Sequence, residues 1–234
     1  MVRIFSIVFI FVFCVSCSEE NKYVPVPKTN NAIIILPETP YNYSDLELPK
    51  HFLLNDSGKL PSAINGLDNT PTNNPITDAG ATLGRVLFYD AKLSKNNTVA
   101  CASCHRQVLG FTDSPVLSLG FDLVPTRRNS IAVVNQMFYK RGHFFWDERA
   151  ATLEDQVLQP FLDKNEMGMT ESEIIQKVSE RSFYSLLFVK AFGSGTISLD
   201  KIANALSQFI RSIVSTHSKY DDGRAQVASM LEPF

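Results

Sequence analysis

The feature that most constrains this chain is a pair of cysteines placed directly before a histidine, Cys101-Ala102-Ser103-Cys104-His105. The other cysteines, Cys14 and Cys17, lie close to the N-terminus. Residues three apart on a helical turn project toward one side of the helix. Both thiols can therefore reach the edge of one bound group, while the histidine side chain reaches the centre of that group. The spacing therefore indicates that the fold is built around a bound group.

Three interpretations compete for this motif. A thioredoxin-like redox pair needs a preceding strand in a βαβ unit, and the sequence before Cys101 shows none. A structural zinc site needs four ligands, and no second Cys/His pair at regular spacing follows. The third is c-type haem attachment, in which Cys101 and Cys104 form thioethers and His105 binds the iron. We therefore predict one covalent haem c.

The N-terminal residues have the pattern of an export signal. Arg3 precedes an apolar run at residues 4–15, which suits a signal peptide and is too short to span a bilayer. The following Ser16-Cys17 resembles the end of a bacterial lipoprotein signal, with a simple secretory signal as the alternative. We expect a signal peptide at residues 1–16, a lipid on Cys17 as the sole membrane attachment, and a location in the periplasm or cell envelope. In that oxidising space, a covalent haem also explains how the two motif thiols avoid pairing with each other.

Composition and local pattern indicate a mostly α fold with long loops. The chain has 234 residues, 44% of them hydrophobic, so it can bury a core. Its net charge is −2, so it lacks the excess of basic residues that is typical of nucleic-acid binding. Residues 17–69 are rich in Pro, Asn and Glu and predict a tether followed by an extended arm. Glycine and proline interrupt residues 110–145, a stretch of the kind that often wraps a functional group.

Helix start signals occur before and after this irregular stretch. Thr77 precedes apolar residues at helical spacing, which predicts a helix that runs up to the cysteine motif. Thr152 starts a short helix that we expect to end at Pro160. Thr170 with Glu173 forms a capping box. Ser198 precedes a long helix with one apolar stripe, formed by Ile202, Ala205, Leu206, Phe209, Ile210 and Ile213.

Four sequence runs, in this order, resemble the N-terminal half of the bacterial di-haem cytochrome c peroxidases and the related MauG proteins. They are LGRVLFYDAKLSKNNTVACASCH, GFTD, RRNSIAVVN and FFWDERAATLEDQVLQPFLDKNEMG. The resemblance implies a cytochrome c-like haem domain over residues 70–222, with residues 223–234 as the start of a junction. Family members continue into a second haem domain, and this sequence contains no second Cys-x-x-Cys-His.

The resemblance also implies roles for individual residues. Gln156 and Glu166 would line the haem face where peroxide binds, the amide orienting the substrate and the carboxylate moving protons. Trp146 would relay electrons between haems, and Asn129 matches a residue that helps to bind calcium between the two halves. The expected partners are hydrogen peroxide and a small electron-donor protein of the cytochrome c or cupredoxin type.

Phe121 stands where many relatives carry a histidine that caps the iron, and because phenylalanine cannot bind iron we expect an open haem face. The other candidate sixth ligands are His51, His143, His217, Met137, Met167 and Met169. Three functions are then open. The preferred one is an exported peroxidase that reduces hydrogen peroxide to water. The alternatives are a MauG-like oxidase that modifies a protein substrate and a non-enzymatic mono-haem electron-transfer or haem-binding protein.

Overall fold

The computed structural model describes residues 36–49, 52, 64 and 66–231, and this part of the chain is mostly helical, as predicted. The expected signal peptide, Cys17 and His51 lie outside the described residues, so they stay predictions. The helices are α2 (Asp78–Tyr89), α3 (Cys101–Cys104), α4 (Leu153–Leu162), α5 (Glu171–Ser179), α6 (Ser182–Phe192), α7 (Leu199–Arg211) and α8 (Lys219–Leu231), with 3-10 turns η1 (Ala91–Leu93), η2 (Gln107–Leu109) and η3 (Gln136–Phe138).

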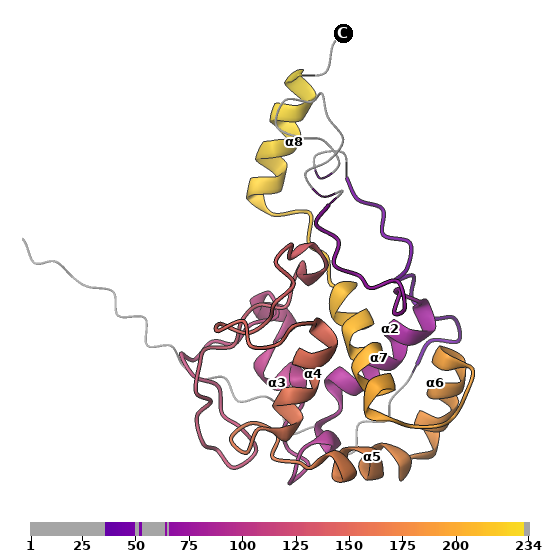
Figure 1. The fold of residues 1–234 in the computed structure, drawn as a ribbon. Coiled ribbons are helices and arrows are strands. Elements are labelled where there is room, and N and C mark those ends of the chain that lie inside the picture. The colour runs from indigo at the N-terminus through magenta and orange to yellow at the C-terminus, as the bar shows by residue number, and fades with distance from the viewer. Residues whose placement is uncertain (1–35, 50–51, 53–63, 65, 232–234) are drawn as a thin grey trace, which may run out of the picture.

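Helix α7 lies at the centre of the helical body, beside α2 and α4 (Figure 1). The predicted apolar stripe is buried from Ile202 to Ile210, and each Ile, Leu or Phe side chain removed from water contributes roughly 1.5–3 kcal/mol. Its last expected member, Ile213, lies beyond the end of the helix at Arg211 and is only partly buried. Gly84 lets α2 approach α7 closely, because a Cβ at this position would lie 1.9 Å from the Ala205 carbonyl oxygen. The core therefore forms around α2 and α7, with α6 packed on α2 and α4 packed on α7.

The helix start signals are confirmed. Thr77, Thr152, Thr170 and Ser198 each accept a backbone N–H bond as the N-cap of α2, α4, α5 and α7. The expected end of α4 at Pro160 is wrong, because the helix continues to Leu162. Proline removes one backbone donor, but the Asp163 N–H still closes the last turn on the Gln159 carbonyl oxygen at 2.9 Å.

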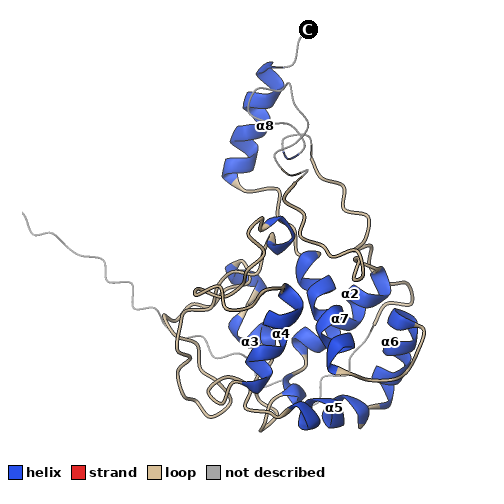
Figure 2. Cartoon of the chain, in the orientation of Figure 1, coloured by secondary structure: helices blue, strands red, loops and turns tan. Residues whose placement is uncertain are grey.

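Long loops fill the region between α3 and α4 (Figure 2). In the described part of the chain they contain isolated β-bridges and no strand. Helix α8 extends away from the helical body, and the expected domain boundary after residue 222 falls inside it. None of the described helices has the length and apolar character needed to cross a membrane.

Candidate functional site

A cavity of about 830 Å³ opens between α3, α4, α7 and the long loops. This volume lies within the range of roughly 300–1,000 Å³ found for small-molecule and cofactor sites. Cys101, Cys104 and His105 all line it, and Phe88 and Leu206 contribute apolar wall from the core helices. The structure thus places the whole cysteine–histidine motif on one cavity wall.

The loop before α3 fixes where the motif begins. The fully buried Ser94 hydroxyl accepts hydrogen bonds from the backbone N–H groups of Thr98 and Val99, each at 3.0 Å. The Ser103 hydroxyl then accepts a bond from the Ala100 N–H at 3.0 Å, at the first turn of α3. These contacts set the direction in which the two thiols enter the cavity.

His105 is oriented by the backbone that follows it. Its Nδ1 lies 3.2 Å from the Phe111 carbonyl oxygen, so Nδ1 carries the proton and Nε2 is the nitrogen left to bind a metal. Phe111 adopts a left-handed conformation, with φ of 59°. Burial lowers the pKa of His105, although the carbonyl groups of Phe111 and Ile131 oppose this, and the ring is therefore neutral.

The two motif thiols do not have the electrostatics of a redox pair. Burial, and secondarily the neighbouring Cys104, raises the pKa of Cys101 to about 12. Burial also raises the pKa of Cys104 to about 11, against a hydrogen bond from Ser118. Reactive cysteines of the thioredoxin type have lowered pKa values, so this environment disfavours the redox-pair interpretation.

Gln156 and Glu166 line the same cavity as His105. Gln156 projects from α4, and Glu166 follows that helix in a turn closed by its own N–H on the Asp163 carbonyl oxygen at 3.1 Å. Among the described residues, neither side chain has a hydrogen-bonding partner, so both polar groups face the cavity free. Such groups are available to a ligand.

Charged neighbours act on the pKa of Glu166 in opposite directions. Burial raises the pKa of this carboxyl, and the nearby Asp163 raises it further. Arg149 and Arg127 act in the opposite direction, because a cation favours the ionised form. The pKa of Glu166 is therefore shifted upward, toward neutral pH, where a side chain that exchanges protons works best.

Trp146 lies in a turn between Phe144 and Ala150, which pair through an isolated bridge. Its indole Nε1 donates to the Asn129 carbonyl oxygen at 2.9 Å, and the residue is 58% exposed while also lining the cavity. Phe145 has φ of 72°, and the Arg149 guanidinium carbon lies 3.5 Å from the centroid of its ring. Trp146 thus extends from the cavity to the surface.

Asn129 also lines the cavity, but its amide nitrogen donates to the Val116 carbonyl oxygen at 3.0 Å. In the described part of the chain, no group of three or more His, Cys, Asp or Glu residues is placed to hold a metal ion. Calcium binding at Asn129 therefore stays a prediction.

The structure separates the candidate iron ligands. His143 and Met167 line the cavity, whereas Met137, Met169 and the exposed His217 are not part of its wall. Phe121 also lies outside the wall, although its neighbour Gly120 belongs to it. The Phe121 ring packs on Gly168, where a Cβ would come within 2.3 Å of it.

These features fit a haem c. Two thiols one turn apart, an imidazole with one free nitrogen, an apolar wall and two unpaired polar side chains converge on one cavity of suitable volume. The sequence had not singled out Arg127 and Arg149, because their effect on Glu166 depends on contacts between distant segments. The arginines within the runs RRNSIAVVN and FFWDERAATLEDQVLQPFLDKNEMG were the available signal.

Comparisons with known proteins agree with this geometry. The family model described as di-haem cytochrome c peroxidase matches residues 78–227. The methylamine utilization protein MauG of Methylophilus methylotrophus is 34% identical over 151 residues, 64% of this chain and 44% of that protein. Cytochrome c551 peroxidase of Nitrosomonas europaea is 34% identical over 152 residues, 65% of this chain and 44% of that protein.

A crystal structure of a MauG-like protein associated with microbial copper homeostasis is also similar, with a TM-score of 0.64 and 33% identity. The match covers 72% of this chain and 49% of that one. The chain thus spans about half the length of the relatives it matches. Because the family model covers most of the chain, including every residue of the cavity wall, the chain belongs to the di-haem cytochrome c peroxidase family.

Proposed function

We propose that this protein is an exported c-type haem peroxidase that reduces hydrogen peroxide to water with electrons from a small redox protein. The observation that carries the proposal is the cavity itself, which joins the Cys101–Cys104–His105 motif to the unpaired Gln156 and Glu166. Cys101 and Cys104 would hold the haem covalently, and His105 would bind its iron through Nε2. When bound, the haem would supply the redox chemistry for cleavage of the O–O bond.

The side chains supply positioning and proton transfer. The Glu166 carboxylate would take a proton from one peroxide oxygen and give it to the other, which would leave as water. The Gln156 amide orients the peroxide by hydrogen bonding. Two electrons and two further protons complete the reduction to two waters, and Trp146, which extends from the cavity to the surface, offers the electrons a route.

The Glu166→Gln variant tests this role. It removes the proton carrier while keeping the size of the side chain, so peroxide turnover should fall by about 10²–10⁴-fold with haem content unchanged. The assay follows peroxide-dependent oxidation of reduced cytochrome c. Glu171→Gln on the exposed start of α5 is the matched control. Full turnover in Glu166→Gln would remove Glu166 from the mechanism.

A MauG-like oxidase that modifies a protein substrate is the second candidate. The similarity to MauG proteins and the exposure of Trp146 beside the cavity favour it. The two functions differ in what is oxidised. Consumption of reduced cytochrome c with peroxide supports the peroxidase, whereas peroxide-dependent modification of a protein without such consumption supports the oxidase.

A further inference from the structure

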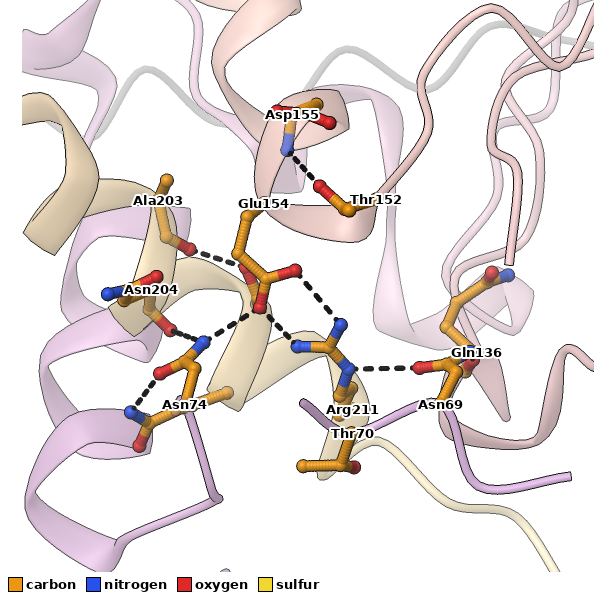
Figure 3. Close-up of polar contacts among 12 residues, drawn as sticks. Asn69, Thr70, Asn74, Gln136, Thr152, Glu154, Asp155, Ala203, Asn204 and Arg211 are labelled. Atoms are coloured by element: carbon orange, nitrogen blue, oxygen red, sulfur yellow. Dashed lines mark hydrogen bonds and ion pairs between the residues drawn. The ribbon is translucent and has the colours of Figure 1, made fainter. Parts of the chain in front are cut away.

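A buried ion pair joins two of the helices that form the cavity wall. Arg211 ends α7 with its side chain 2% exposed, and it meets Glu154 at the start of α4 through two bonds (Figure 3). The Arg211 Nη1 donates to Glu154 Oε1 at 2.6 Å, and its Nη2 donates to Oε2 at 3.0 Å. This two-bond geometry fixes the orientation of both side chains.

Two asparagines extend the pair on either side (Figure 3). Arg211 Nε donates to Asn69 Oδ1 at 3.0 Å, and the Asn69 amide donates to the carbonyl oxygen of Gln136 at 2.7 Å. On the other side, the Asn74 amide donates to Glu154 Oε1 at 2.8 Å and accepts a bond from Gln208. The Glu154–Arg211 pair is thus bonded through Asn69 to the η3 segment and through Asn74 to Gln208 of α7.

The elements joined in this way are the walls of the cavity. Helix α4 contributes Gln156, α7 contributes Leu206 and Ile210, and the η3 segment contributes Gln136. Glu154, Arg211 and the two asparagines do not themselves belong to the cavity wall. Any effect they have on a bound ligand must therefore act through the wall residues.

Stability alone does not account for a charged pair at this place. Replacing a buried ion pair by well-packed apolar residues is often neutral or stabilising, because the desolvation of both charges offsets their attraction. What apolar side chains do not reproduce is a fixed register between the helices. The lowered pKa of Glu154, which arises from Arg211 and Asn74 against the effect of burial, agrees with an ionised pair.

We propose that Glu154 and Arg211 are positioning residues that hold Gln156 and the η3 wall in place around the ligand of the haem iron. The inference rests on the proposed haem site. It predicts that disrupting the pair changes ligand binding in the cavity even where the stability of the fold is restored.

The test uses the haem-loaded protein and cyanide, a ligand of ferric haem that would bind within the cavity that Gln156 lines. Glu154→Gln should weaken cyanide binding by about tenfold, the effect typical of losing a residue that orients a metal site, and Gln156→Ala should weaken it at least as much. The double variant Glu154→Met with Arg211→Met should recover the thermal midpoint of the wild type but keep the weakened cyanide affinity.

Arg181→Gln is the matched control, because it breaks the Arg181–Asp90 ion pair, and neither of these residues lines the cavity. It should lower the thermal midpoint without changing cyanide affinity. Unchanged affinity in Glu154→Gln or Gln156→Ala, or full recovery of affinity in the double methionine variant, would overturn the proposal. Cyanide binding needs no turnover, so a wild type that binds cyanide but does not reduce peroxide would contradict the proposed function alone.

Discussion

At the scale of single residues, Glu166 depends on two neighbouring glycines. A Cβ at Gly120 would lie 1.7 Å from the Asn165 carbonyl oxygen, so the loop carrying Phe121 can pass this close only with glycine. Gly168 has φ of 69° and carries the Phe121 ring on its open face. The Phe121 N–H then donates to the Glu166 carbonyl oxygen at 2.8 Å, which ties both loops to the cavity wall.

Gly168→Ala should therefore destabilise the protein in two ways. The left-handed backbone costs roughly 1–2 kcal/mol with any side chain, and the contact with Phe121 adds about 1–3 kcal/mol of overpacking. Gly110→Ala separates the two, because Gly110 has φ of 66° and nothing within 4 Å of a Cβ. Urea unfolding should show the larger loss for Gly168→Ala. Equal losses would mean that the Phe121 ring moves aside at no cost.

Residue patterns alone predicted one side of the site and not the other. The Cys101–His105 motif is local, so its spacing alone indicated the cofactor and its proximal ligand. Gln156 and Glu166 came only from resemblance, because a lone amide and a lone carboxyl have no diagnostic spacing. The Glu154–Arg211 pair joins residues 57 positions apart, and no local pattern could reveal it.

At the scale of elements, α5 shows how one carboxylate can serve a helix start and an ion pair together. Glu173 accepts the Thr170 N–H at 2.8 Å and also meets Lys95 at 2.5 Å. The Lys95 bond, followed by the Thr170 backbone, lowers the pKa of Glu173 to about 2. Because the carboxyl has a lower pKa in the folded state than in the unfolded chain, its contribution to stability exists only while it is ionised.

Glu173→Gln should consequently lower the thermal midpoint at neutral pH, where the wild-type carboxylate is fully ionised. The difference from the wild type should shrink as the pH falls below about 4.3, the value of an unperturbed Glu, because the wild type then loses its advantage toward pH 2. Thermal melts of both proteins between pH 7 and pH 3 measure this. A difference that stays constant over the range would assign the effect to side-chain shape.

Other elements were not predicted, for identifiable reasons. In α6, apolar residues surround the helix, including the exposed Leu186 and Val189, so no single stripe marks it as a helix. In α8, the side chains that the structure describes are mostly polar and exposed, and they form no apolar stripe. By contrast, α2, α5 and α7 combine an N-cap with a buried stripe, and these were predicted from sequence.

At the scale of the whole molecule, the cavity and the hydrophobic core share their walls. Phe88 of α2, and Leu206 and Ile210 of α7, belong to the core cluster and also line the cavity. The free energy of unfolding of a globular protein is only about 5–15 kcal/mol. Exposing the apolar cavity walls to water would therefore cost a large fraction of it. The fold should therefore depend on the group that fills the cavity.

The double variant Cys101→Ser with Cys104→Ser tests this dependence, because it removes both thiols that would form the thioether bonds and keeps the size of the side chains. Purified without haem, it should melt at least about 10 °C below the haem-loaded wild type, since a ligand that binds only the folded state stabilises it by several kcal/mol. Added haemin should recover part of this loss, because His105 and the apolar walls remain to bind it. Circular dichroism melts with and without haemin measure both effects. Equal midpoints for the haem-loaded wild type and the haem-free variant would show that the helical body is stable with an empty cavity. The hydrophobic core would then not depend on a group bound in the cavity.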